Sequence, residues 1–222
     1  MIDKILLFLE VKMKKRLHDK KAGIAILISL IAISLAEVIF RPVTMGLESM
    51  PAPNFGEQLV VIALAVTILI LTAKGKDRAS YICYGLWIGY FVLDQLFELP
   101  AHLISFVLLL AGKTVLPSPA IVVVHASFVL STIFIIILGI LLVEYLNDGT
   151  ICNKAFNVLC IATIVLFLLN IALTVYDAIA GANAEFLLAT FHDLYLITMV
   201  FMFAFFAYDS AKAQLKKTNL TK

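Results

Sequence analysis

The segment that decides the fold spans residues 81–112 and reads YICYGLWIGYFVLDQLFELPAHLISFVLLLAG. A segment this long and this apolar is typical of a helix inside a bilayer. It nevertheless carries Asp94, Glu98 and His102, which are spaced four residues apart and so share one face of a helix. Ionisable groups in transmembrane helices are costly and usually face protein or a water-filled cavity. The segment therefore predicts a membrane helix with a polar functional site.

The same helix carries a pair of glycines. Gly85 and Gly89 form a Gly-x-x-x-Gly pattern, which lets a neighbouring helix approach closely. Nine positions separate Gly85 from Asp94, which at about 100° per residue places them on opposite faces. We expect the glycine face to pack against another helix and the opposite face to point to a polar environment. That opposite face carries Tyr84, Trp87, Phe91, Asp94 and Glu98.

The composition of the whole chain supports this interpretation. Of the 222 residues, 63% are hydrophobic and 14% are charged, and the mean hydropathy is +1.06. Soluble domains are roughly 45–50% apolar and about 25% charged. We therefore expect an all-α, polytopic transmembrane helix bundle in contact with the lipid bilayer. The lysines lie near the ends of the apolar segments without interleaved aromatic residues, so no nucleic-acid partner is expected.

Six apolar segments are suited to cross the membrane. Pro100 is expected to kink the third helix. Residues 103–111 are too few to cross back, so we expect an outer re-entrant or interfacial segment, or a kinked continuation of the helix. The six predicted spans cover about residues 22–40, 58–73, 81–102, 120–146, 155–180 and 184–208.

Basic residues predict the orientation of the chain in the cell membrane. Because lysine and arginine are enriched on the cytoplasmic side, both termini are expected to be cytoplasmic. The chain divides into a basic, amphipathic cytoplasmic segment (1–21), a membrane domain (22–209) and a basic cytoplasmic tail (210–222). The basic positions that support this topology lie in residues 4–21, 74–78, 154 and 212–222.

This topology places ionisable residues from five spans in the outer half of the membrane. A charge left alone in hydrocarbon is costly, so such groups need each other, water or an ion. Four side chains are predicted to meet in one outer cavity: Asp94, Glu98, His125 and His192. Further ligand-binding candidates are Glu37, His102 and Asp177 at its rim, and Asp193. By contrast, Glu144 and Asp209 lie at inner ends and should reach water.

The fifth span carries a row of polar residues on one helical face. The row consists of Thr163, Asn170, Thr174 and Asp177. One interpretation is a wet path that leads inward from the outer site. The alternative is hydrogen bonding between helices, which is the commoner role of such residues in membranes and is the favoured interpretation.

Imidazole and carboxylate groups are ligands that zinc and iron sites use. We therefore consider a divalent transition metal (zinc, iron or copper) as a cofactor, with Asp94, Glu98, His125 and His192 as its ligands. Asp94 and Glu98 share a helix face and could bind one ion or bridge two. No local metal motif such as His-Glu-x-x-His occurs, so the pattern also fits a polar site without metal.

Three functions fit these features. The first is a membrane protein that binds a cation, a proton or a small polar ligand in the outer cavity, as a transporter or as a subunit of a complex. The second is a membrane-embedded, metal-dependent enzyme, either a hydrolase or an oxidoreductase. The third is a structural or assembly subunit whose buried charges pair with each other. A membrane-protein partner and a homo-oligomer are both compatible with the sequence.

Overall fold

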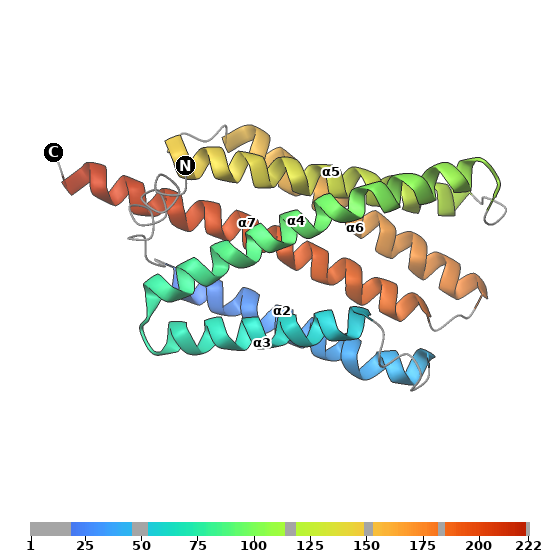
Figure 1. Cartoon of the computed structure of the whole chain (residues 1–222), viewed down its shortest axis with the longest axis horizontal. Helices are drawn as coiled ribbons and strands as arrows, with labels where there is room; N and C mark the ends of the chain where they lie inside the picture. The colour runs from blue at the N-terminus through green and yellow to red at the C-terminus, as the bar shows by residue number, and fades with distance from the viewer. Residues whose placement is uncertain (1–18, 46–52, 114–118, 149–152, 182–184, 221–222) are drawn as a thin grey trace.

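The computed structural model describes residues 19–45, 53–113, 119–148, 153–181 and 185–220. Within these ranges the chain forms six helices and no strand. Successive helices run side by side in alternating directions (Figure 1). We call the end of the bundle where α2, α4 and α6 end the histidine end, and the opposite end the lysine end. The helices are α2 (Lys20–Met45), α3 (Pro53–Ala73), α4 (Asp77–Leu110), α5 (Pro119–Asp148), α6 (Asn153–Gly181) and α7 (Glu185–Leu220).

All six helices are long and apolar enough to cross a membrane, with mean hydropathies between 1.5 and 2.8. In hydrocarbon every backbone polar group must be satisfied within the protein, and a helix achieves this by itself. Large apolar side chains such as Val43 and Phe97 are 76% and 80% exposed on the bundle surface, as expected of a lipid-facing surface. The predicted six-span helical bundle is confirmed. Of the predicted N-terminal segment, residues 1–18 lie outside the described part, whereas α7 continues through the predicted tail to Leu220.

The last helix, α7, is the centre of the bundle. It contacts α2, α4, α5 and α6, whereas α2 to α6 contact one another in chain order. Within the most apolar window of α7, 67% of the residues are buried, against 11–44% for the other five helices. Most side chains in this window of α7 therefore face protein rather than lipid, although Phe201 and Tyr208 are 51% and 61% exposed.

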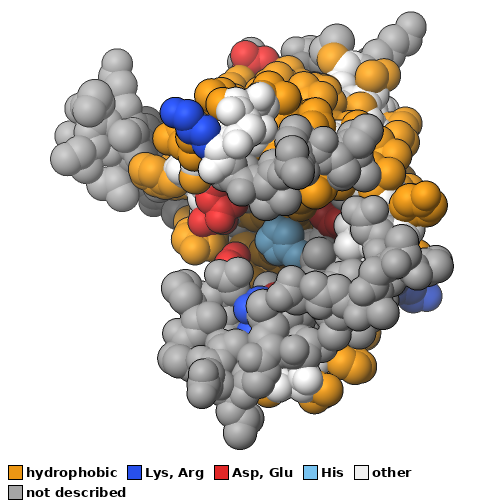
Figure 2. Space-filling model, turned by 90° about the vertical axis from the view of Figure 1, so that its right-hand side faces the viewer, with side chains coloured by type: hydrophobic (Ala, Val, Ile, Leu, Met, Phe, Trp, Pro, Cys, Tyr) orange, Lys and Arg blue, Asp and Glu red, His pale blue; other side chains and the backbone are white. Residues whose placement is uncertain are grey.

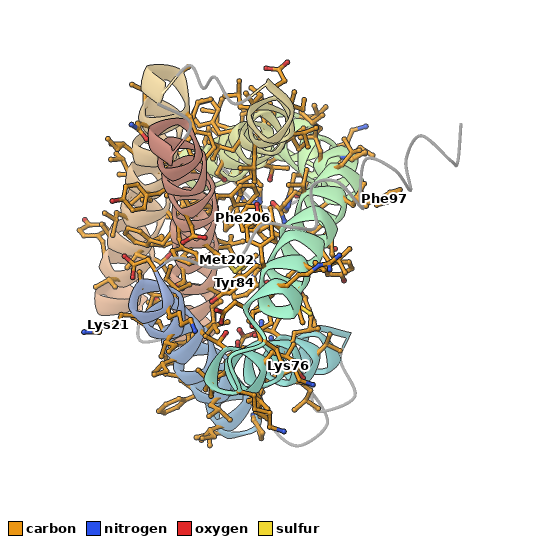
Figure 3. The ribbon with its side chains drawn as sticks, turned by 90° about the vertical axis from the view of Figure 1, so that its left-hand side faces the viewer. Lys21, Lys76, Tyr84, Phe97, Met202 and Phe206 are labelled. Atoms are coloured by element: carbon orange, nitrogen blue, oxygen red, sulfur yellow. The ribbon has the colours of Figure 1, made fainter. Side chains whose placement is uncertain are left out.

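Aromatic rings of α4 between Tyr81 and Phe91 contact rings of α7. Figure 3 shows Tyr84, Met202 and Phe206 in the interior between these two helices, whereas Phe97 points outward. Aromatic pairs at such separations add to the hydrophobic stabilisation that burial provides. The ring centroids are 4.6 Å apart in Tyr81–Phe206, 5.6 Å in Tyr84–Phe205, 6.2 Å in Phe91–Phe203 and 6.3 Å in Phe91–Tyr195.

The prediction for the two faces of α4 is therefore partly wrong. Tyr84, Trp87 and Phe91 belong to the buried core instead of facing a polar environment. Gly89 is exposed, and a Cβ there would meet no atom within 4 Å, whereas a Cβ at Gly85 would lie 3.4 Å from Phe206. The physical reason is that three large rings bury far more apolar surface than a pair of glycines does.

Glycines do seat neighbouring helices at two other positions. The Tyr84 hydroxyl donates a hydrogen bond of 2.8 Å to the Gly23 carbonyl, which joins α4 to α2. A Cβ at Gly23 would lie 3.1 Å from the hydroxyl oxygen of Tyr84. A Cβ at Gly139 on α5 would lie 2.7 Å from Cγ2 of Val92 on α4. These two contacts join α4 to α2 and to α5.

The long helix α4 continues without a break through Pro100 to Leu110. Its 34 residues extend over about 51 Å, which exceeds the roughly 30 Å hydrocarbon core of a bilayer. Pro100 cannot donate the hydrogen bond that an amide would give to the Leu96 carbonyl. The residues after Pro100 are a continuation of the helix rather than a separate re-entrant segment.

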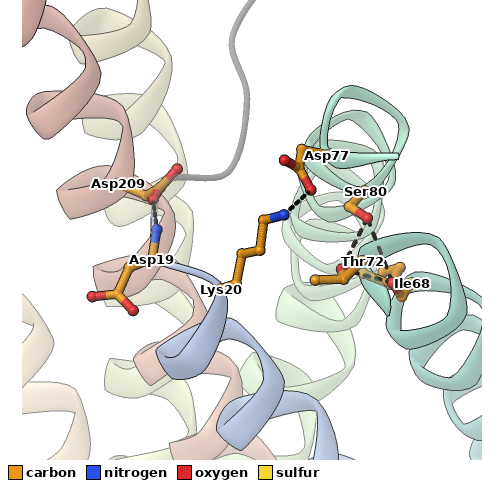
Figure 4. A network of polar contacts seen from close by, with 7 residues as sticks. All are labelled: Asp19, Lys20, Ile68, Thr72, Asp77, Ser80 and Asp209. Atoms are coloured by element: carbon orange, nitrogen blue, oxygen red, sulfur yellow. Dashed lines mark hydrogen bonds and ion pairs between the residues drawn. The ribbon is translucent and has the colours of Figure 1, made fainter. Parts of the chain in front are cut away.

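At the lysine end, Asp19 joins α2 to α7. Its carboxylate accepts a 3.2 Å hydrogen bond from the Ala22 amide, as a helix N-cap does. Its own amide donates to the Asp209 carboxylate at 2.8 Å (Figure 4). Asp209 is fully buried, so the expectation that it reaches water is wrong, because the carboxylate is used to hold the start of α2. Glu144, by contrast, is exposed as expected.

The start of α4 is held at the same end. The Lys20 ammonium lies 2.9 Å from the Asp77 carboxylate, and the Thr72 and Ser80 hydroxyls are 2.9 Å apart (Figure 4). Gly75 between α3 and α4 has a φ of 69°, a conformation that favours glycine. These contacts fix the α3–α4 hairpin next to α2.

Gly139→Ala is expected to lower stability, whereas Gly89→Ala is not. The new Cβ at 139 would lie 2.7 and 2.8 Å from the two γ-carbons of Val92, a stiff β-branched side chain. Overpacking of this kind typically costs about 1–3 kcal/mol. Thermal unfolding of both variants in detergent measures the difference. Equal destabilisation by the two substitutions would contradict this packing.

Candidate functional site

A buried ion pair on α2 lies toward the histidine end. The helix continues through Pro42 to Met45, so Glu37 and Arg41 are one turn apart on the same face. Arg41 Nη2 lies 2.8 Å from Glu37 Oε1, and the side chains are 10% and 3% exposed. Glu37 Oε2 has no hydrogen-bond partner among the described residues. The pair therefore presents an acceptor oxygen inside the bundle.

The predicted polar face of α4 begins one turn beyond its aromatic residues. Glu98 Oε2 lies 3.5 Å from His102 Nε2 and accepts a 3.4 Å hydrogen bond from the Gln95 amide. Gln95 Oε1 in turn accepts a 3.4 Å hydrogen bond from the Thr132 hydroxyl on α5. The His102 ring also stacks on Phe128 of α5, with centroids 6.0 Å apart. These contacts orient Glu98 and connect it to α5.

His192 brings α7 to the same place. It is partly buried and interacts electrostatically with Glu37 and Arg41 on α2 and with Glu98 and His102 on α4. Its ring centroid lies 6.4 Å from that of Tyr195, whose own ring contacts Phe91. In Figure 2, which looks onto the histidine end, a histidine side chain lies in a hollow beside acidic side chains. Three of the predicted helices thus deliver ionisable groups to one place.

Glu57 adds a fourth helix, α3, to this place. Glu57 was not predicted from the sequence as a site residue. It interacts electrostatically with Glu37, Asp94 and Glu98. The sequence predicts that the second span begins at about residue 58, but α3 begins at Pro53 and contains Glu57. The available signal was Pro53 itself, because proline is favoured in the first turn of a helix.

We call the polar side chains that α2, α3, α4 and α7 contribute to this place the polar cluster. Arg41 and Gln95, like Glu57, were not among the predicted site residues. The spacing of Glu37 and Arg41, four residues apart, could have indicated their pairing. The titratable members of the polar cluster are Glu37, Arg41, Glu57, Asp94, Glu98, His102 and His192.

Other predicted site residues do not join it. His125 Nδ1 lies 3.0 Å from the Ile121 carbonyl of its own helix. Among the described residues, His125 makes no hydrogen bond or ion pair with Asp94, Glu98 or His192. Asp193 is 1% exposed and has no electrostatic interaction with the polar cluster. The side chain of Asp177 lies outside the described part of the structure.

A metal centre gains no support from this geometry. Across the described residues, no group of three or more His, Cys, Asp or Glu side chains is arranged to hold a metal ion. The set of Asp94, Glu98, His125 and His192 is divided, because His125 is bound to its own helix. The metal-dependent enzyme considered from the sequence stays a prediction.

Comparison with known proteins gives no family to which the function could be tied. No protein-family model matches the chain, and neither a curated protein nor a solved structure matches it.

Arg41→Leu is expected to destabilise the protein by about 3–5 kcal/mol, because it leaves the Glu37 carboxylate buried without its partner. The double variant Glu37→Leu with Arg41→Leu should recover most of that loss. Glu98→Gln is the control, since its half-exposed pair with His102 should contribute at most about 1 kcal/mol. Denaturation in detergent compares the four proteins. A double variant no more stable than Arg41→Leu alone would contradict a buried pair.

Proposed function

We propose that this protein binds a cation in the polar cluster, as a transporter or as a subunit of a membrane complex. The observation that carries the proposal is the excess of carboxylates. Glu57 interacts electrostatically with Glu37, Asp94 and Glu98, and Asp94 also interacts with Glu98. Arg41 is the one permanent cation of the cluster. While the carboxylates are ionised, the cluster stays negative whether its two imidazoles are protonated or not. Because like charges repel strongly at low dielectric, a bound cation would relieve this repulsion.

The burial of the cluster supports a site that is reached from the surface. The Glu98 side chain is 49% exposed, whereas that of Glu37 is 3% exposed. Carboxylates thus extend from the surface at the histidine end to the buried ion pair. A cation can exchange its water for carboxylate oxygens in steps along such a series, which suits both binding and transport.

The distribution of basic residues supports an orientation in the cell membrane. Exposed basic side chains at the lysine end include Lys20, Lys21, Lys74, Lys76 and Arg78. Because basic residues are enriched on the cytoplasmic side, we place the lysine end in the cytoplasm and the polar cluster on the opposite side. Residues 19 and 220 both lie toward the lysine end (Figure 1), which supports the proposal that both termini are cytoplasmic.

Cysteine labelling tests this orientation. With Cys83, Cys152 and Cys160 replaced by serine or alanine, Ser49→Cys should react with a membrane-impermeant maleimide in intact cells. Asn219→Cys should react only after the cells are permeabilised. The reverse pattern, or equal labelling from one side, would contradict the proposed topology.

A thermal-shift titration tests cation binding. The detergent-purified protein is titrated with K⁺, Mg²⁺, Zn²⁺ and methylammonium as chlorides at constant ionic strength, in a buffer without sodium. A ligand that binds the folded state raises its stability, by about 2.7 kcal/mol at a hundredfold excess over Kd. At least one cation should raise the melting temperature saturably, and this shift should be lost in Asp94→Asn and in Glu57→Gln.

The control is Glu144→Gln, which removes an exposed carboxylate from α5 away from the cluster and should keep the full shift. The proposal fails if no cation shifts the wild type, or if the shift survives in both cluster variants. Uptake of the active cation into proteoliposomes then separates a transporter from a binding subunit.

A further inference from the structure

A second group of polar side chains is buried between helices away from the polar cluster. Asn170 on α6 is fully buried, and neither its amide oxygen nor its amide nitrogen has a hydrogen-bond partner among the described residues. Asp193 on α7 is 1% exposed, and its Oδ1 is likewise without a partner there. Polar groups buried without partners are costly, and the cost is greatest for a charge.

Helical phase places Asp193 toward α5 and α6. The ring of Phe191 stacks on Phe40 of α2, with centroids 5.6 Å apart, and Tyr195 contacts Phe91 of α4. Asp193 follows Phe191 by two residues, or about 200° around the helix, so it faces away from α2. The other neighbours of α7 are α5 and α6. This explains why His192 interacts with the polar cluster while the adjacent Asp193 does not.

Asn170 faces the same junction at a similar depth. The neighbours of α6 among the described helices are α5 and α7, so a fully buried side chain on α6 points between them. Asn170 lies eleven residues before the end of α6, and Asp193 lies eight residues after the start of α7. At about 1.5 Å per residue in antiparallel helices, the two depths differ by about one helical turn. The side chains can therefore approach each other.

Hydroxyl groups add oxygen ligands on both helices. Thr174 lies one turn after Asn170 on the same face of α6. Thr190 lies three residues before Asp193 on α7, and its hydroxyl also has no partner among the described residues. Carboxylate, amide and hydroxyl oxygens are ligands for hard cations, not for the soft metals that prefer thiolates.

We propose that Asp193, Asn170, Thr174 and Thr190 form a buried site for one monovalent cation, and that this cation is sodium. The site offers a single carboxylate, so one unit of positive charge neutralises it, whereas a divalent ion would leave an uncompensated charge in a low-dielectric interior. Buried oxygen ligands of this kind hold sodium within helix bundles. The site stands independently of the cation proposed for the polar cluster.

The test is sodium-dependent stability of the full chain in detergent, with choline chloride replacing sodium chloride at constant ionic strength and pH. Sodium should raise the melting temperature of the wild type saturably. It should do the same in Asp94→Asn, which alters the polar cluster alone. Asp193→Asn and Asn170→Ala should abolish the sodium shift. The sodium shift of the wild type, and its loss in these two variants, are therefore expected whether or not the polar cluster binds a cation.

Thr174→Val, which keeps the shape of the side chain, provides a milder variant in case the others do not fold. It should move the midpoint of the sodium titration by about tenfold, the effect of losing about 1.4 kcal/mol of binding. The proposal would be overturned if sodium did not change the melting temperature of the wild type. It would also be overturned if the sodium shift persisted in Asp193→Asn. The proposal would also be overturned if the melting temperature depended on pH but not on sodium, and did so only when Asp193 is present. That result would identify a proton as the ligand of Asp193.

Discussion

The contact between Phe91 and Tyr195 is one of four aromatic contacts that set α4 against α7. Phe91 lies one turn before the polar face of α4, and Tyr195 lies one turn after His192 on α7. Because their rings meet edge to face with centroids 6.3 Å apart, the two helices keep one register. That register brings Glu98 and His192 close enough to interact. Apolar packing thus positions the charges, which by themselves would repel or drift toward water.

The position of α7 at the centre of the bundle gives the two polar sites their separate surroundings. One side of α7 faces α2 and α4 and carries His192 into the polar cluster. The other side faces α5 and α6 and carries Asp193, for which no opposing charge is found among the described residues. The proposed open cluster with many charges and the proposed closed site with one would therefore share a single helix.

Much of the fold and part of the site could be predicted from the sequence. Long apolar segments define spans because hydrocarbon admits few other structures. The shared depth of Glu37, Glu98 and His192 predicts that they converge, and this grouping stays a prediction. Depth alone does not give direction around a helix, so it did not indicate that His125 Nδ1 lies 3.0 Å from the Ile121 carbonyl of its own helix. The aromatic face of α4 was likewise read as polar because nothing in the sequence identifies the neighbour that covers it. Glu57 was missed because the second span was predicted to begin at about residue 58, one residue after it.

The most direct test of the central claim, that α4 and α7 bring Glu98 and His192 together, is a cross-linking measurement. With the native cysteines replaced, the pair Glu98→Cys and His192→Cys is treated with a short bifunctional thiol reagent in membranes. Efficient intramolecular cross-linking is expected for this pair. The neighbouring pair Phe97→Cys and His192→Cys should not react, because Phe97 is 80% exposed and points outward (Figure 3). Equal cross-linking of the two pairs, or none in either, would contradict the arrangement of α4 against α7.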